Sequence, residues 1–350
     1  YGGGSAERNG TLAEVEAALG ARTVQRFGGI EPNPAYETLM GAVEQIRREK
    51  LDFLLAVGGG SVIDGTKFVA AAVDHEGDPW EILQTRGKCV PGALAMGCVL
   101  TLPATGSEMN CAAVITRRSL NAKLAFSSQH VFPRFSVLDP TKTFSLPPRQ
   151  IANGAVDAFV HVTEQYLTYP VNAAVQDRYA EGLLQTLIEV GPQALAAPLD
   201  YDVRANLMWA ATQALSGAVG AGVPQDWATH MIGHEITALY GLDHAQTLAI
   251  VLPNLLHLRR DAKRAKLLQF AARVWNIHTG TEDERIDAAI ARTRAFFESV
   301  GVKTRLSDYG IGADAVDRIV AQLEAHGMKK LGEHRDIDLA TSRRILEACV

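Results

Sequence analysis

Two short runs of Asp and His residues have the spacing of metal ligands. Asp157 and His161 are four residues apart, His230 and His234 are four residues apart, and His244 follows in a nearby turn. Residues i and i+4 lie on one face of a helix, so each pair can reach a single ion. A carboxylate with several imidazoles suits Zn(II) or Fe(II). Spacing leaves open which three or four of the five groups bind.

Chance is the competing interpretation of these runs. The chain has 10 His among 350 residues, so pairs four residues apart also arise at random. Two such pairs in one apolar, helix-patterned region, with a further His nearby, favour a shared metal ion. An ion that protein does not fully enclose keeps a position for water or substrate. The runs therefore predict a reactive metal centre, with a closed structural site as the alternative.

The composition is typical of a globular enzyme. Apolar residues make up 47% and charged residues 21% of the chain, which fits neither a disordered nor a fibrous protein. The formal net charge of -5 and the lack of a long basic run argue against a nucleic-acid partner. No apolar run approaches the roughly 18 residues that span a bilayer, so we expect no membrane partner.

Cysteine usage favours a reducing compartment. No CxxC spacing occurs among the four cysteines, so neither a zinc knuckle nor a disulfide framework is predicted. Free thiols in the cytoplasm are the simpler interpretation, and no secretory signal is recognisable. The sequence begins at Tyr1, in a glycine-rich turn, rather than at Met. We therefore expect the first strand of the fold to be missing from it.

The first part of the chain has the pattern of parallel strands that end in turns of small residues. Residues 51–57 form an apolar run typical of a strand covered on both faces, and they lead into Gly58-Gly-Gly-Ser61 and a helix. Backbone N–H groups in such a turn favour an anion. Ser61 is a predicted N-cap with Asp64 as its partner. A capped turn without a ligand is the alternative, since the GxGxxG pattern is absent.

A second turn follows another buried strand. Residues 98–102 lead into Pro103-Ala-Thr-Gly-Ser-Glu108. Ligands of doubly wound sheets bind outside the carboxyl ends of the strands, so the two turns together predict a nucleotide site. Further strands are predicted at 23–27 and 135–138, and helices at 11–19 and 36–49.

After Leu146-Pro-Pro148 the sequence shows long helical periods and almost no strand signal. The predicted helices are 149–168, 174–195, 202–219, 224–240, 244–257, 260–275, 282–300, 313–326 and 340–349. We therefore predict an α/β dinucleotide-binding domain in residues 1–147 and an all-helical metal and substrate domain in residues 148–350. The active site is expected in the cleft between them.

In combination, these motifs resemble the group III iron-activated alcohol dehydrogenases. The motifs, in the family's order, are Gly58-Gly-Gly-Ser-Val-Ile-Asp-Gly-Thr-Lys67, Ala104-Thr-Gly-Ser-Glu108, Leu146-Pro-Pro-Arg149, Asp157-Ala-Phe-Val-His161 and His230-Met-Ile-Gly-His234 with His244. The resemblance covers essentially the whole chain and looks closest to the bacterial butanol dehydrogenases and broad-range NADPH-dependent aldehyde reductases. It implies a Rossmann-like α/β nucleotide-binding domain followed by an all-α metal-binding domain, the architecture of dehydroquinate synthase.

The resemblance also implies roles for single residues. The metal ligands of similar proteins fall on Asp157, His161, His230 and His244, whereas the position of His234 faces the substrate without binding the ion. His234 is then a catalytic or proton-handling group. The cofactor positions that carry over are Gly59, Gly60, Ser61, Asp64, Thr101, Asn110 and Lys123.

The adenosine side of the cofactor site favours NADP(H). Family members that prefer NAD have an acidic residue after the first strand, where this chain has Gly2-Gly-Gly-Ser5. No carboxylate there repels a 2'-phosphate, and Gly3 and Ser5 can donate to it. Asn33 is the matching contact in the Pro-Asn-Pro turn. Glu7 and Arg8 act in opposite directions on an anion.

The expected reaction is reversible hydride transfer between NADPH and the carbonyl carbon of an aldehyde. No Lys or Arg occurs between Arg149 and Arg178 or between Arg204 and Arg259, the stretches that carry the metal runs. A phosphorylated or dicarboxylic substrate needs cationic partners. The predicted substrates are therefore short to medium uncharged aldehydes and alcohols, such as butanal.

Two other functions compete with this prediction. A non-redox enzyme resembling dehydroquinate synthase also uses NAD and a metal, but its anionic substrate fits poorly with the lack of basic residues. A non-catalytic metal-binding protein leaves the two hydroxyl-rich turns without a purpose. Relatives suggest a homodimer or a larger homo-oligomer.

Overall fold

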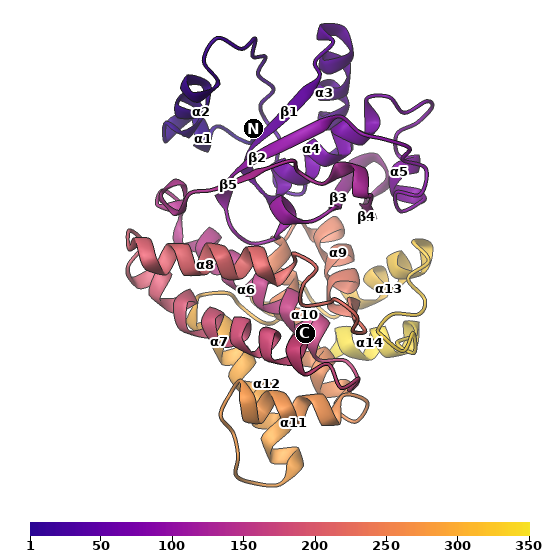
Figure 1. The fold of residues 1–350 in the computed structure, drawn as a ribbon. Helices are drawn as coiled ribbons and strands as arrows, with labels where there is room; N and C mark the ends of the chain where they lie inside the picture. Colours follow the sequence, from indigo (N-terminus) through magenta and orange to yellow (C-terminus); the bar gives the residue numbers. More distant parts are fainter. The chain divides into compact units, whose positions relative to one another are not determined.

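The computed structural model describes residues 1–350. The chain forms two compact units, each with most of its residue contacts inside itself (Figure 1). The first unit spans Tyr1–Leu146 and the second spans Pro147–Val350. Each unit has its own core. No helix of either unit has both the length and the apolar character that crossing a membrane requires.

A three-stranded parallel sheet forms the centre of the first unit. Its order is β1-β2-β5, with β1 at Phe53–Gly59, β2 at Ala95–Leu102 and β5 at Ser136–Leu138. In the parallel β1–β2 ladder, Phe53 lies opposite Ala95. Both faces of the sheet are covered by helices, which explains why its strands read as nearly continuous apolar runs.

Helices of the first unit pack on opposite faces of this sheet. Alternate residues of a strand point to opposite faces, and Val57 joins Val99 in a cluster with Ala6 and Leu12. The helices of that face are α1 (Ser5–Arg8) and α2 (Thr11–Leu19). The helices α3 (Tyr36–Glu49) and α4 (Gly60–Ala72) pack together, and α4 follows β1 without a break.

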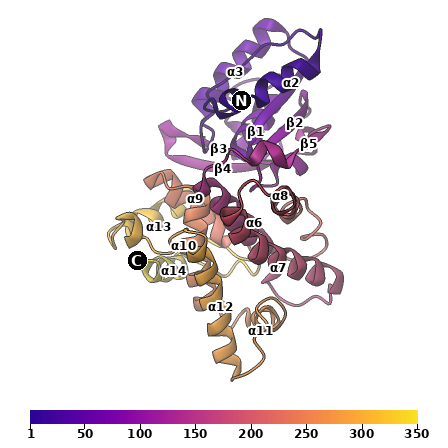
Figure 2. The same ribbon diagram turned by 90° about the vertical axis from the view of Figure 1, so that its left-hand side faces the viewer.

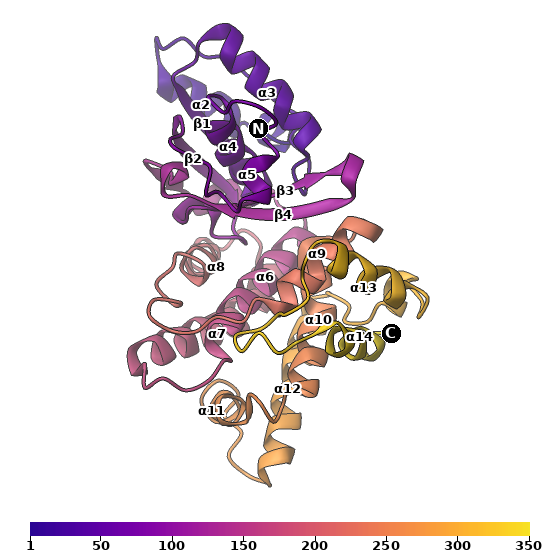
Figure 3. The same cartoon turned by 90° about the vertical axis from the view of Figure 1, so that its right-hand side faces the viewer.

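An antiparallel hairpin was not predicted from the sequence. It pairs β3 (Ala112–Arg117) with β4 (Ala122–Ser127) and packs on α4 (Figure 3). Asn121, with a φ of 46°, makes the turn in the left-handed region that Asn tolerates. The remaining short elements of this unit are α5 (Glu81–Gln84), η1 (Ser107–Met109), η2 (Arg118–Leu120), η3 (Gln129–Val131) and η4 (Pro140–Thr143).

Two local predictions for the first unit are wrong. Residues 23–27 form no strand. They are joined to the first residues of the chain by isolated hydrogen bonds, such as the one that Tyr1 N–H donates to Phe27 O at 2.9 Å. Ser61 is not an N-cap, since α4 begins at Gly60 and its N-cap is Gly59 without a side-chain cap. Asp64 instead accepts hydrogen bonds from Ser107 Oγ at 2.6 Å and from Val114 N–H at 2.8 Å.

The second unit is helical, as predicted. Its helices are α6 (Pro148–Tyr166), α7 (Ala174–Ala196), α8 (Tyr201–Ala214), α9 (Ala228–Tyr240), α10 (His244–Leu258), α11 (Arg264–Arg273), α12 (Glu282–Ser299), α13 (Ala315–Ala325) and α14 (Leu339–Ala348), with the 3-10 turn η5 (Ser307–Tyr309). The largest departure from the predicted spans lies between α8 and α9. There, Gly217 and Gly222 have positive φ angles of 93° and 71°, which break the helical pattern.

Helix α6 runs through the core of the second unit beside α7 and α10 (Figure 2). Phe159 on α6 is fully buried among Phe270, Phe296 and Phe297, with ring centroids 5.3 to 6.5 Å away. Such aromatic packing fixes the helix that also carries Asp157 and His161. A parallel α/β unit followed by a helical unit confirms the predicted fold class.

We predict that Gly60→Ala lowers the free energy of unfolding by about 1–3 kcal/mol. A Cβ atom at residue 60 would lie 2.2 Å from Thr105 Oγ1 and 2.9 Å from Thr105 Cβ, so the start of α4 and the turn after β2 would have to separate. Urea denaturation measures the change.

Gly182→Ala is the matched control for this prediction. Gly182 is exposed on α7, and a Cβ atom at this residue would have no heavy atom within 4 Å. This substitution should raise stability by up to about 1 kcal/mol, because Ala favours a helix interior. Equal effects of the two substitutions would contradict the close contact at Gly60.

Candidate functional site

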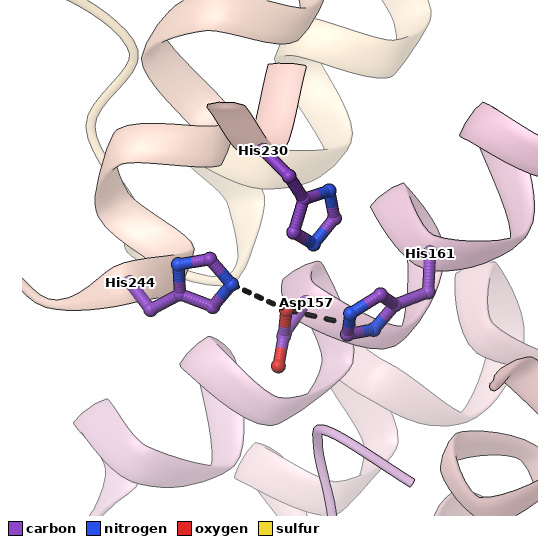
Figure 4. A group of neighbouring side chains, drawn as sticks. All are labelled: Asp157, His161, His230 and His244. Carbon is purple, nitrogen blue, oxygen red and sulfur yellow. Dashed lines mark ion pairs between the residues drawn. The ribbon is translucent and has the colours of Figure 1, made fainter. Parts of the chain in front are cut away.

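Three helices of the second unit bring four predicted ligands together. Asp157 and His161 lie one turn apart on α6, His230 lies in the first turn of α9, and His244 is the first residue of α10. One ligand atom from each lies within 4.8 Å of the others, as Figure 4 shows. The first three residues are buried and His244 is half-buried.

The distances within this group suit one shared cation. Asp157 Oδ1 lies 3.6 Å from His161 Nδ1 and 3.7 Å from His244 Nε2 (Figure 4). Both distances are too long for hydrogen bonds. His161 Nδ1 is buried and has no hydrogen-bond partner, which is costly unless another group satisfies it. A carboxylate and three imidazoles fit Zn(II) or Fe(II) in both donor type and number.

Burial also sets the protonation of the histidines. Burial is the main reason that the pKa of His161 falls to about 4; Asp157 opposes this shift, and the charge of His230 adds to it. The His161 imidazole is therefore neutral at neutral pH, and neutral imidazole is the form that binds a metal.

His234 lies beside the four-residue group without joining it. Its ring centroid is 5.3 Å from that of His244 and 6.2 Å from that of His230. The residue is buried one turn along α9 from His230. A buried imidazole at this position adjoins the four-residue group.

A carboxylate fixes the start of α10, where His244 stands. Asp243 is the N-cap of this helix, and its N–H donates to Gln246 Oε1 at 3.0 Å in a capping box. Arg149 donates to both Asp243 carboxylate oxygens at 2.7 Å, and Asn153 Nδ2 donates to one of them at 2.7 Å. Because Arg149 and Asn153 lie on α6, this clamp sets where His244 stands relative to Asp157.

Sequence reasoning missed a second supporting carboxylate, Glu164. It is buried on α6 and forms a hydrogen bond with His230 Nδ1. Burial raises the pKa of Glu164, while its bonds from Thr229 lower it. The signal was present in the spacing, since Asp157, His161 and Glu164 follow the i, i+4, i+7 pattern of one helix face.

In the first unit, the structure places most predicted cofactor residues around the two turns. Gly59 and Gly60 form the junction of β1 and α4, with Ser61 and Asp64 in the first turns of the helix. Thr101 is buried near the end of β2.

Buried polar bonds extend this arrangement to the hairpin. Asn110 Oδ1 accepts from Lys67 Nζ at 2.9 Å, and the same lysine donates to Ala112 O at 2.8 Å. Lys123 on β4 donates to Asn33 Oδ1 at 2.9 Å, which joins two predicted cofactor residues far apart in sequence. Lys67 was quoted within a motif but was not predicted as a site residue.

Gly3 and Ser5 lie apart from these bonds, in the N-terminal segment. Gly3 is exposed and has open space around the position of a side chain. Ser5 is the first residue of α1, after Gly4 with a φ of 89°. Both residues are exposed.

Two family models match the chain, one for each unit. Residues 1–140 match the iron-containing alcohol dehydrogenase model, and residues 151–348 match the C-terminal model of the Fe-containing alcohol dehydrogenase family. Together they span nearly the whole sequence.

Known proteins and solved structures agree with these models. The NADPH-dependent aldehyde reductase YqhD of Escherichia coli (strain K12) is 65% identical over 99% of this chain and 90% of that protein. The crystal structure of E. coli K-12 YqhD covers 100% of this chain and 90% of its own, with a TM-score of 0.99 and 64% identity. NADH-dependent butanol dehydrogenase A from Thermotoga maritima has a TM-score of 0.95 and 33% identity over 100% of this chain and 90% of its own.

These matches confirm the family resemblance and the fold that the motifs predicted. They also remove support from the dehydroquinate synthase-like and non-catalytic alternatives, because both units match alcohol dehydrogenase models. The chain belongs to the iron-containing alcohol dehydrogenase family and is an oxidoreductase.

Proposed function

We propose that this oxidoreductase reduces short to medium uncharged aldehydes, such as butanal, with NADPH and catalyses the reverse oxidation of the alcohols. The observation that carries the proposal is the convergence of Asp157, His161, His230 and His244 from three helices. The name of the E. coli relative, an NADPH-dependent aldehyde reductase, supports the same reaction.

These four residues would hold one divalent cation, Zn(II) or Fe(II). When bound, such an ion polarises the carbonyl oxygen and stabilises the negative charge that develops on it. The burial of Asp157, His161 and His230 keeps water away from this charge, which strengthens its electrostatic stabilisation. The Arg149–Asp243 clamp holds the start of α10, so that His244 needs little rearrangement to bind.

His234 is our proposed proton-handling residue. Hydride transfer to the carbonyl carbon leaves an alkoxide, and this oxygen must gain a proton. The imidazole of His234 lies beside His244 without being part of the four-residue group, so it is placed to donate or to hold that proton. Water and the ribose of the cofactor are the other routes.

The proposed NADP(H) site lies in the first unit. Gly59, Gly60 and Ser61 present backbone N–H groups at the start of α4, where a phosphate is favoured. The remaining proposed contacts are Asp64, Thr101, Asn110, Lys123 and Asn33. Gly3 and Ser5 leave room for a 2'-phosphate and put no carboxylate against it.

The charges of the helical unit favour an uncharged substrate. Arg149, in the first turn of α6, is engaged by Asp243. Lys263 is buried with Asp226 and Glu333, at 2.9 and 2.7 Å. With these cations neutralised, an anionic substrate lacks the charged partners that its desolvation requires.

Assembly and location are part of the same proposal. The cysteines form no disulfide in the structure, which suits a reducing compartment, and we propose a cytoplasmic enzyme. A homodimer or larger homo-oligomer is proposed from the family resemblance.

Removing the metal should abolish aldehyde reduction. We expect the chelator-treated protein to lose more than about 100-fold of its butanal-dependent NADPH oxidation, since the developing oxyanion loses its stabilisation. Activity should return with one of the two ions, Zn(II) or Fe(II), and that result identifies the working ion. His244→Ala should stay inactive after either addition, and activity that survives both treatments would refute a catalytic metal.

The choice of cofactor should depend on charge at residue 3. Gly3→Asp places a carboxylate where we propose the 2'-phosphate and should weaken NADPH binding by about 10-fold to 100-fold, equivalent to about 1–3 kcal/mol of repulsion. NADH binding should change little.

Gly3→Asn is the uncharged control of nearly the same size. Fluorescence titration of each variant with both cofactors separates charge from bulk. If Gly3→Asp and Gly3→Asn weakened NADPH binding equally, the proposed place of the 2'-phosphate beside residue 3 would be wrong.

The N-cap of α10 should matter for the metal as well as for stability. Asp243→Ala should lower the free energy of unfolding by about 1–2 kcal/mol and weaken Zn(II) binding by about 10-fold or more, because His244 loses its support. Asp200 caps α8 by accepting from Val203 N–H at 3.0 Å and serves as the control.

Asp200→Ala should destabilise the protein by a similar amount while leaving Zn(II) affinity unchanged. Thermal melts of the metal-free proteins and chelator competition measure the two quantities. A parallel fall in metal affinity for both variants would show that the loss reflects general destabilisation.

A further inference from the structure

Glu164 lies behind His230, on the side away from the other three proposed ligands. Its Oε2 forms a hydrogen bond with His230 Nδ1, and its Oε1 accepts from Thr229 N–H at 2.7 Å. The residue is 2% exposed. Both carboxylate oxygens are therefore directed at the first turn of α9, the turn that carries the ligand.

This contact decides which imidazole nitrogen is available to an ion. A neutral imidazole has one N–H. When Glu164 is ionised, its carboxylate can only accept a hydrogen bond, so the proton of His230 stays on Nδ1 and the lone pair on Nε2. Figure 4 shows the ring nitrogen far from the backbone turned toward Asp157 and His161. The tautomer favoured by Glu164 is thus the one that presents a lone pair to the proposed metal.

Further bonds hold Glu164 and α9 in register. The backbone of Asp226 donates to Glu164 O at 2.9 Å, and Ala228 N–H donates to Asp226 Oδ1 at 3.0 Å. The segment before α9 is thereby attached to α6 at the level of Glu164. His230 cannot move along α6 without breaking these bonds.

A buried lysine completes the arrangement. Lys263, 2% exposed, pairs with Asp226 Oδ2 at 2.9 Å and Glu333 Oε1 at 2.7 Å and donates to Leu167 O at 2.7 Å. Leu167 directly follows the end of α6. A cation at this place offsets part of the negative charge that Asp226 and Glu164 bring into the core.

We infer that Glu164 is a positioning residue that fixes the tautomer and orientation of His230 for the metal, and that Lys263, through Asp226, holds this support in place. The inference rests on the proposed metal site. Supporting groups of this kind typically change metal affinity by 10-fold to 100-fold when removed.

Glu164→Gln tests the inference with almost no change in volume. The amide has one accepting oxygen, whereas Thr229 N–H and His230 Nδ1 both need an acceptor. If the oxygen serves Thr229, the NH2 group faces Nδ1 and favours the tautomer with its proton on Nε2, which cannot bind the ion. If the oxygen serves His230, the bond to Thr229 is lost.

Glu181→Gln is the matched control. Glu181 is a buried carboxylate on α7 that accepts from Tyr166 Oη at 2.9 Å and from Gln269 Nε2 at 2.7 Å, away from the proposed ligands. The Glu181→Gln substitution removes a buried carboxylate and leaves the four proposed metal ligands unchanged.

The dissociation constant for Zn(II) is measured on the metal-free full chain by competition with a chromogenic chelator. Glu164→Gln should raise it by about 10-fold to 100-fold, whereas Glu181→Gln should leave it within about twofold of the wild type. Thermal melts of the metal-free proteins report any general loss of stability. Equal affinities of the wild type and Glu164→Gln, or equal losses in both variants, would overturn the inference.

A measurement on the wild type covers the case in which Glu164→Gln does not fold. In a crystal structure with Zn(II), the ion should bind His230 through Nε2 while Nδ1 stays hydrogen-bonded to Glu164. Binding through Nδ1, or Glu164 turned away from the ring, would contradict the inference alone. A wild-type protein that takes up no Zn(II) or Fe(II) would instead refute the proposed metal site, so the two failures can be told apart.

Discussion

The cost of burying Asp157 among three histidines is the constraint on which the helical unit depends. An ionised carboxylate inside a protein requires a partner charge or several hydrogen bonds. Here Asp157 Oδ1 lies 3.6 and 3.7 Å from two imidazole nitrogens, and Asp157, His161 and His230 are all buried. A cation held by the four residues would offset the charge of this carboxylate, and its binding energy would stabilise the packing of α6, α9 and α10.

Helix α6 has two faces with different tasks. One face packs Phe159 into an aromatic cluster with Phe296 and Phe297, which holds the helix rigidly. The other carries Asp157, His161 and Glu164 toward α9 and α10. Ligands on a well-packed helix are placed more accurately than ligands on loops, so the same packing that stabilises the unit also prepares the site.

Buried charged side chains also hold the segments of the first unit in place. Asp64 accepts from Ser107 and Val114, and Lys67 donates to Asn110 and to the backbone of the hairpin. Burial lowers the pKa of Lys67 to about 8 despite the attraction of Asp64. Both side chains project from the helix that follows the glycine turn. They fix the junction of β1 and α4 next to the turn after β2, which is what the proposed nucleotide site requires.

The sequence alone determined the class of fold and the identity of the chemical groups. Apolar runs that end in glycine turns and the later helical periods are local patterns, so they predicted parallel strands and the helices of the second unit closely. The combination of motifs identified the family. Pairs such as Asp157 and His161 were recognisable because four residues return to one face of a helix.

Only the tertiary structure decided how these groups meet. Spacing treated His230 and His234 alike, whereas the structure groups His230, and not His234, with Asp157, His161 and His244. The clamp of Arg149 on Asp243 and the bond of Glu164 to His230 join residues 94 and 66 positions apart. Local patterns carry no information about such distant pairs. Their geometry follows from the packing of the helices, which the whole core determines at once.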